Sequence, residues 1–533
     1  MSKGSGRSRK RKGTVSPQGT DDSLGRRIRE VGPEHFGLLL VDSGKRHFAV
    51  RLTNFFGDCL WEPEPVRSLR LALEAMMAEV EKQMAKHGLT DLVVGIERTG
   101  RWHHPVKQMV EKKWPVKMIH PFTTKQLRQP ASSGIKTDPV DLIAMQRAMI
   151  CGYGTEDLEL PEPWLEFRLV SRARADLVSK RACLKTQCAG RMEALLPGYT
   201  DLFEDLWKTP TAAALIEAYP SARKLLRADA QRIMERLSGM GTKCQRSTVD
   251  RVRSWAAQAA PADAGAAVNH RILRDHLALL RQMTVLIQRY EIELLGLLVQ
   301  TPVVLLLSIT GLNVVSASDY GSEMGPDEHY IGAKNVTGRA GLFPSRYQSD
   351  GTDHANGPVV AGRNARLRQA IVDVAHNLLS RNPYFQAWRR LPDHKDLQNK
   401  EARIAVGSRF VRISFHMLRH RTVFNHPLAG RQDSVLCKLL AFGRDRRVPA
   451  DRLYELCAQA LRQLPDDGLE FERRALLGGG WNGSTNSPRP SSAAPRRSAR
   501  KPAYVVKLIA DVDHRLLAGK GGEPATSVSP RIP

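Results

Sequence analysis

Residues 34–150 alternate short apolar runs with stretches of helical periodicity, and this alternation restricts the possible folds more than any other feature of the chain. The run 36-FGLLLVD-42 is followed by a short polar turn and by 47-HFAVRL-52, a pattern that predicts a β-hairpin. The run 91-DLVVGIE-97 is nearly continuous, as expected for a strand buried on both faces, and 116-VKMIH-120 predicts a further strand.

Helical periodicity separates these strands. Residues 65–87 carry one apolar face, and residues 103–113 and the segment that begins at Asp138 predict two more helices. The apolar face of the first helix consists of Leu69, Leu73, Met76, Met77 and Val80. Strands that alternate with helices in this way predict an α/β domain.

The next 140 residues or so are helical in pattern. One set of residues has a 4-3 spacing, which is typical of one arm of a helical hairpin or coiled coil. The set consists of Leu273, Leu277, Leu280, Thr284, Ile287, Glu291, Leu294 and Leu298. Residues 164–184 are the candidate for the opposite arm, and 197–265 are expected to form shorter helices.

These patterns divide the chain into six predicted segments. They are a disordered basic tail (1–33), an α/β domain (34–155), a helical coiled-coil region (156–300), an α-rich domain (301–395), a helical extension (396–477) and a low-complexity tail (478–533).

The charge of the chain indicates its partner. Lys and Arg number 81 against 55 Asp and Glu, a net charge of +26, which favours a polyanion, with nucleic acid ahead of an acidic membrane surface. No apolar run approaches the roughly 18 residues that a membrane-spanning helix needs. The seven cysteines form no CxxC pair, so we expect reduced thiols in a cytoplasmic protein.

Asp138 and Asp141 have two possible explanations. In 137-TDPVD-141, Asp138 is a good N-cap, Pro139 suits the first helical position and Asp141 suits the positive end of the helix dipole. Residues three apart on a helix also lie about 5–6 Å apart at Cβ, so the two carboxylates can face one point.

Two further acids favour a shared site. Asp42 closes one predicted strand and Glu97 closes another, although each also suits a turn. Two carboxylates 4 Å apart repel by roughly 4 kcal/mol at an effective dielectric near 20, so a cluster of four requires a dication. Oxygen ligands suit Mg²⁺ or Mn²⁺, and two such ions support cleavage of a phosphodiester, as in a ribonuclease-H-like (RuvC-like) nuclease.

At this point the chain resembles the IS110 family of transposases, the DEDD recombinases related to the Piv invertase. The resemblance extends from about residue 36 to about residue 390. In the first half it rests on 40-LVDSGK-45, 95-GIERTGRW-102, 120-HP-121 and 136-KTDPVD-141, which follow the family's motifs in order and spacing. The resemblance implies a RuvC-like domain in which Asp42, Glu97, Asp138 and Asp141 bind metal.

In the second half the resemblance rests on 311-GLN-313, 341-GLFP-344, 348-QSDG-351 and 362-GRNARLRQ-369, and it implies an α-rich transposase domain with Ser349 as nucleophile. Asn313 and Asp350 stand where the family has glycine. Close to this serine in sequence, Arg346, Arg363, Arg366 and Arg368 are candidates for contacts with phosphates.

The expected protein is therefore a transposase or site-specific recombinase of an insertion sequence, guided by a structured RNA. DNA and the guide RNA would be its partners, as a dimer or tetramer in the bacterial cytoplasm, associated with the nucleoid. The acids would assist Ser349 within one chain or across a dimer. Two alternatives remain, namely a metal-dependent Holliday-junction-type nuclease that uses no serine, and an inactive nucleic-acid-binding protein.

Overall fold

The computed structural model describes residues 23–128, 136–157, 160–349, 352–354, 357, 359, 363–426, 433–482 and 501–519. The chain divides into two compact units, Met1–Glu159 and Leu160–Pro533, which are described separately.

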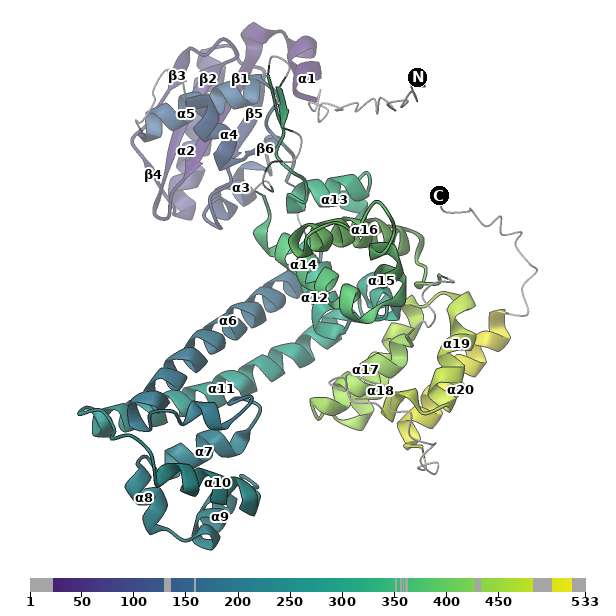
Figure 1. Cartoon of the computed structure of the whole chain (residues 1–533). Coiled ribbons are helices and arrows are strands. Elements are labelled where there is room, and N and C mark those ends of the chain that lie inside the picture. Colours follow the sequence, from purple (N-terminus) through teal and green to yellow (C-terminus); the bar gives the residue numbers. More distant parts are fainter. Residues whose placement is uncertain are drawn as a thin grey trace, which may run out of the picture. The chain divides into compact units, whose positions relative to one another are not determined.

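A mixed β-sheet forms the centre of the first unit (Figure 1). Its order is β3-β2-β1-β5-β6, and β4 pairs with β2. The central strand β1 runs antiparallel to β2 and parallel to β5, as the hairpin and the buried strand in the sequence predict. The strands are β1 (Phe36–Ser43), β2 (His47–Asn54), β3 (Cys59–Trp61), β4 (Val66–Arg67), β5 (Asp91–Glu97) and β6 (Val116–Ile119).

Helices cover both faces of this sheet, because alternate residues of β1 and β5 point to opposite sides. One face packs on α2 (Arg70–Lys86) and α3 (His104–Val110). The other packs on α1 (Ser23–Val31), α4 (Pro121–Arg128) and α5 (Asp138–Ile150). The predicted α/β domain is thereby confirmed.

The prediction of a disordered tail over 1–33 is wrong for its last third. Residues 23–31 form α1, in which Leu24 is buried against the sheet and Arg27 pairs with Asp91 at 2.5 Å. Leu24, Ile28 and Val31 supply a helical apolar stripe that the surrounding charge obscures in the sequence. Residues 1–22 lie outside the described residues.

Two long antiparallel helices, α6 (Trp164–Leu195) and α11 (Ala266–Leu298), pack along each other in the second unit, as the 4-3 spacing predicts (Figure 1). One end of this pair carries a separate small core. Its elements are η2 (Thr200–Leu202), α7 (Pro210–Ala218), α8 (Ala222–Arg227), α9 (Ala230–Gly239) and α10 (Arg246–Ala256).

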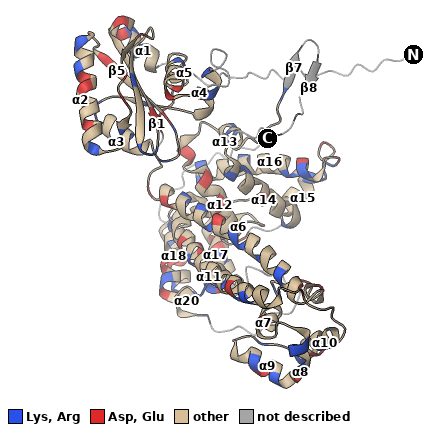
Figure 2. Ribbon diagram, turned by 90° about the vertical axis from the view of Figure 1, so that its left-hand side faces the viewer, with Lys and Arg blue, Asp and Glu red and all other residues tan. Residues whose placement is uncertain are grey.

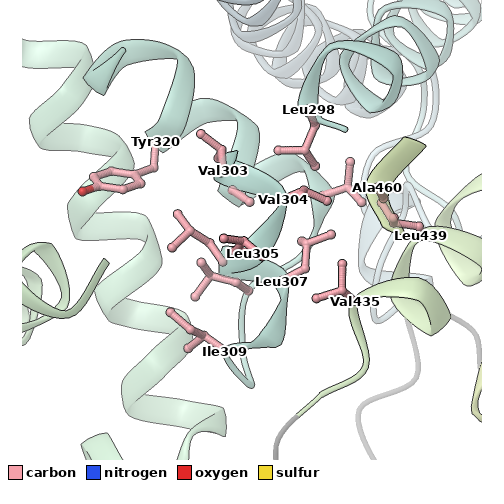
Figure 3. Packing of buried hydrophobic residues seen from close by; sticks show 14 of the residues in the cluster. Leu298, Val303, Val304, Leu305, Leu307, Ile309, Tyr320, Val435, Leu439 and Ala460 are labelled. Atoms are coloured by element: carbon pink, nitrogen blue, oxygen red, sulfur yellow. The ribbon is translucent and has the colours of Figure 1, made fainter. Parts of the chain in front are cut away.

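A larger core occupies the other end of the α6–α11 pair. Figure 3 shows side chains of η3 lying between Tyr320 of α12 and residues of α17 and α18, such as Val435 and Ala460. The helical extension therefore shares one core with the preceding domain. The remaining elements are η3 (Pro302–Ser308), α12 (Val314–Met324), η4 (Asp327–His329), α13 (Ala333–Ala340), β7 (Tyr347–Ser349), β8 (Thr352–His354), α14 (Ala365–Arg381), α15 (Pro383–Arg389), α16 (Asn399–His420), α17 (Val435–Asp445), α18 (Ala450–Gln463), α19 (Asp466–Leu477), η6 (Gly480–Asn482) and α20 (Ala503–Gly519).

The prediction of a low-complexity tail over 478–533 is wrong for residues 501–519. These residues form α20, and the fully buried Val505, Leu508 and Val512 join the core. The hydroxyl of Tyr454 donates to Asp511 at 2.7 Å. The spacing of the three apolar residues is helical, but the neighbouring Ser-, Pro- and Arg-rich segment dominates the composition.

Within the described part of the chain, no single helix is long and apolar enough to cross a membrane. The pair formed by α11 and η3 reaches that length and composition only across a 104° bend.

Candidate active site

Asp42 and Glu97 end neighbouring parallel strands on the same face of the sheet. The register pairs Val41 of β1 with Ile96 of β5, so the next residue on each strand is an acid. Asp42 follows Leu38 and Leu40 on the face that packs on α5, and Glu97 follows Val93 on that face. The strand pairing therefore places the two carboxylates side by side.

Helix α5 brings Asp141 to the same edge. A Cβ at Gly95 would lie 3.0 Å from the Cγ of Met149, so α5 crosses β5 closely where β5 has no side chain. Asp141 lies two turns before Met149 on the buried face of α5 and is only 2% exposed. Asp138 lies one turn earlier and is exposed.

The start of α5 does not use these carboxylates as helix caps. Thr137 occupies the N-cap, where it makes no side-chain hydrogen bond, and Asp138 is already the first helical residue. Of the two explanations for these aspartates, an N-cap role of Asp138 does not agree with the start of the helix. A favourable interaction with the helix dipole remains for both acids, but it gives no reason to bury Asp141.

The pKa values reflect the crowding of the acids. Burial first, and then the charge of Asp42, raise the pKa of Glu97 to about 7. Burial and the charges of Asp141 and Asp138 likewise raise the pKa of Asp42, while its hydrogen bond with Glu97 opposes this increase. The hydrogen bond between the two carboxyl groups raises the pKa of Glu97 and lowers that of Asp42. All four acids thus interact at one edge of the sheet.

Two basic residues accompany the acids, namely Lys136 of the Lys-Thr-Asp motif and Arg128, which the sequence does not single out. The Nε of Arg128 lies 2.6 Å from Oδ1 of Asp141, although neither atom has a hydrogen-bond partner with acceptable geometry. Burial raises the pKa of Asp141, while Arg128 and then Lys136 oppose that increase. Arg128 ends α4, eight residues before Lys136, and no periodicity or motif marks it.

The donor chemistry suits Mg²⁺ or Mn²⁺, because every acidic side chain at this edge offers carboxylate oxygens. Among the described residues, however, no group of three or more His, Cys, Asp or Glu side chains is arranged to hold a metal ion. The hydrogen bond between Asp42 and Glu97 and the ion pair of Arg128 with Asp141 reduce the repulsion between the acids here. Both would have to give way to a bound cation.

Ser349 ends the first strand of a two-stranded β-ribbon in the second unit. Strand β7 pairs antiparallel with β8, and Ser349 is opposite Thr352. The neighbouring Asp350 and Gly351 lie outside the described residues, as does the side chain of Ser349. The ribbon therefore places this serine beside the dipeptide that connects its strands.

The base of the ribbon is fixed to the helical core. Gly341 ends α13 in the left-handed conformation (φ 70°), and the buried Leu342 follows it into the core. Asn364 donates its backbone N–H to Arg339 (3.0 Å), caps α14 by accepting from the N–H of Leu367 (3.0 Å) and donates its amide to Glu323 (3.1 Å). The two ends of the segment that holds Ser349 are thus tied together.

The four candidate phosphate ligands occupy different environments. Arg368 donates to the carbonyl of Ala340 at 3.0 Å and is half-buried, so it supports the base of the ribbon. Arg366 pairs with Asp176 of α6 at 2.9 Å. Arg346 and Arg363 are exposed.

The turn 311-GLN-313 before α12 differs from a glycine-rich phosphate site. The side chain of Asn313 accepts from the N–H of Ser316 (2.8 Å), and the Ser316 hydroxyl accepts from the N–H of Asn313 (3.0 Å), which forms a capping box. The side chain thereby fills the position that an anion would take. Lys438 donates to the carbonyls of Leu307, Ile309 and Leu312, so the extension also braces this turn.

Two protein-family models match the chain, one over the region of the acids and one over the region of the β-ribbon. The DEDD transposase family of IS110 elements matches residues 41–197, which include the four acids. The transposase IS116/IS110/IS902 family matches residues 303–389, which include the β-ribbon and its base. No curated protein matches the chain.

Proposed function

Because the chain belongs to the IS110 family of transposases, we propose that it cuts and rejoins DNA strands with a metal centre formed by Asp42, Glu97, Asp138 and Asp141 and with Ser349 as nucleophile. The protein is a DNA transposase or recombinase, and DNA is its partner. The metal centre is supported by the convergence of four acids on one edge of the sheet, where the pKa of Glu97 is raised to about 7.

The four acids have separate roles in this proposal. A cation held by Asp42, Glu97 and Asp141 would polarise phosphate oxygens and stabilise the charge that develops as the DNA bond breaks. Asp138, which is exposed, would complete the site from the solvent side. Lys136 and Arg128 would balance the remaining negative charge before the cation binds.

The proposed chemical step conserves the number of phosphate ester bonds. The Ser349 oxygen forms a bond to the phosphorus, the bond from phosphorus to one deoxyribose oxygen breaks, the serine proton leaves, and the departing oxygen receives a proton. Since one ester replaces another, the reverse attack by a DNA hydroxyl rejoins the strand without ATP.

Two further parts of the proposal concern partners. We propose that a structured RNA guides the choice of DNA site and that the chain acts as a dimer or tetramer. The net charge of +26 suits a protein that holds two polyanions.

The metal centre is tested by single substitutions of matched aspartates. Asp138 and Asp451 both lie in the first turn of a helix, α5 and α18 respectively, and both are exposed. Loss of a dipole interaction alone costs about 0.3–1 kcal/mol of stability in each case. We expect Asp138→Asn, but not Asp451→Asn, to abolish Mg²⁺-dependent strand cleavage while DNA binding persists. Full cleavage by Asp138→Asn would refute its assignment to the metal centre.

A further inference from the structure

Helices α8–α10, together with the turns between them (residues 221–256, the α8–α10 module), carry a concentration of positive charge. The module contains nine Lys or Arg and three Asp or Glu, a net charge of +6 in 36 residues. The whole chain carries +26 in 533 residues, so the charge density of the module is more than three times the average. Figure 2 shows Lys and Arg on all three helices.

The few acids of the module are engaged locally. Asp229 caps α9 by accepting from the N–H of Arg232 at 2.8 Å. Glu235 accepts from Gln231, and Asp250 pairs with Arg246 at 3.3 Å. Ion-pair partners for the cations of α8 therefore have to come from elsewhere.

The cations of α8 have no ion-pair partner in the described part of the chain. Arg223, Lys224 and Arg227 are exposed, and none of them forms an ion pair with a described residue. Leu225 is 1% exposed and anchors α8 in the small core, and Ala222 also packs against this core, whereas the three cations of the helix are exposed. Arg253 of α10 reaches to 3.5 Å from the carbonyl of Leu226, which places α10 beside the end of α8.

An ordinary solvated helix of this chain has a different pattern. On α2, Arg70 pairs with Glu74 at 2.8 Å and Lys82 with Glu79 at 3.4 Å. On α18, Arg452 pairs with Glu455 at 2.9 Å. Such pairs within one helix are the usual arrangement for solubility. The absence of any acid from α8 is therefore better explained by an external polyanion.

The aromatic residues indicate which polyanion fits. Single-stranded nucleic acid is usually bound by exposed aromatic rings that stack on bases. In the small core, Trp255 packs on Tyr199 with ring centroids 5.7 Å apart, and Phe203 and Tyr219 are buried. Trp207 and Trp255 are half-buried, and no aromatic side chain of the described residues 197–265 is fully exposed. Cations that lack fully exposed aromatic rings beside them suit the backbone of a duplex.

We infer that the α8–α10 module binds the phosphate backbone of duplex DNA, with Arg223, Lys224 and Arg227 as direct contacts. This inference depends on the proposed function only in that DNA is the partner. The contacts are independent of base sequence, because they involve phosphates alone.

The test compares two triple variants of the full-length chain. Arg223→Gln, Lys224→Gln and Arg227→Gln remove the α8 cations, whereas Arg70→Gln, Lys82→Gln and Lys86→Gln remove three exposed cations of α2. Affinity for a DNA duplex is measured by fluorescence anisotropy between 50 and 200 mM salt. Each lost phosphate contact reduces the slope of log K against log salt by about 0.9. The advantage of the wild type over the α8 variant should therefore shrink about fortyfold across this range.

The outcomes separate this inference from the proposed function. The α2 variant should behave as the wild type, and circular dichroism should show that both variants are folded. An unchanged slope in the α8 variant overturns the inference, as does a loss confined to an RNA duplex of the same sequence. A wild-type protein that binds duplex DNA but never cleaves it would refute the proposed chemistry and leave the binding result valid.

Discussion

At the scale of single residues, Glu97 determines how the acidic site responds to pH. Its pKa of about 7 in the folded chain exceeds the ordinary value of 4.5, so the folded state binds more protons than the unfolded state between these values. Without a divalent cation, stability therefore falls as pH rises from about 4.5 to about 7. At about 1.4 kcal/mol per pKa unit, the total effect is on the order of 3 kcal/mol.

A cation at this site would reverse that trend, since it must displace the proton from Glu97. We expect Mg²⁺ to raise the melting temperature of the protein little at pH 5.5 and several degrees at pH 8, as measured by scanning fluorimetry. Glu97→Gln should weaken the dependence on pH, to which the raised pKa values of Asp42 and Asp141 still contribute, and should remove most of the gain. An equal gain at both pH values would argue against Glu97 as a ligand.

Arg128 provides an independent check of the charge balance. The residue lies against the buried Asp141, and removal of one partner of a buried pair typically costs about 3–5 kcal/mol. We expect Arg128→Ala to unfold at a lower urea concentration than the wild type in EDTA, and Mg²⁺ to recover much of the difference. If Mg²⁺ stabilises the variant no more than the wild type, Arg128 does not compete with a cation for Asp141.

At the scale of elements, the periodicity of apolar residues predicts many of the helices and strands. The apolar runs of β1, β5 and β6 and the 4-3 spacing of α11 reflect burial that repeats regularly along the chain. Glu291 interrupts that spacing, yet it is buried, because Arg174 (3.3 Å) and Arg446 (3.0 Å) neutralise it. Because these arginines belong to distant segments, the sequence around Glu291 does not predict that it is buried.

The same limit applies to the candidate site. Strand ends and the helix at Asp138 indicated the four acids, because each is tied to a local element. Arg128 and Asn364 act through contacts with Asp141 and Glu323, which only the folded chain brings near. The sequence does not predict helices α1 and α20, because the polar composition around them outweighs their short apolar stripes.

A substitution of Lys438 tests whether α17 stabilises the turn before α12. Its ammonium group on α17 donates to three carbonyls of the turn before α12, at 2.7–3.0 Å. The carbonyl of Ile309 also accepts from the N–H of Leu312 at 3.2 Å, so it keeps a partner without Lys438. Each of the other two carbonyls left without a partner costs about 1–3 kcal/mol, and Asp433 loses the ion pair that it forms with Lys438 at 2.8 Å. Lys438→Met should therefore reduce the free energy of unfolding by at least about 2 kcal/mol in urea titrations, whereas Lys400→Met, at an exposed position, should change it by less than about 0.5 kcal/mol. A small effect of Lys438→Met would show that the turn does not need this brace.

At the scale of the whole molecule, the C-terminal helices are part of the second unit rather than an addition to it. Val505, Leu508 and Val512 of α20 are fully buried, and burial of each such side chain contributes about 1.5–3 kcal/mol. We expect a chain that ends at residue 482 to aggregate or to lose a cooperative thermal transition. A chain that ends at residue 519 should melt as the full-length protein does. Equal stability of both truncated chains would contradict the packing of α20.

The proposed recombination mechanism depends on a covalent link between Ser349 and DNA. Incubation of the full-length protein with Mg²⁺ and its DNA substrate, followed by denaturation and proteolysis, should yield a nucleotide attached to the peptide of residues 347–363, which trypsin releases by cleavage after Arg346 and Arg363. Ser345→Ala and Tyr347→Phe should leave this adduct intact, and Asp141→Asn and Ser349→Ala should abolish it. Cleavage of DNA by Ser349→Ala, or an adduct on Tyr347, would contradict the assignment of Ser349 as the nucleophile.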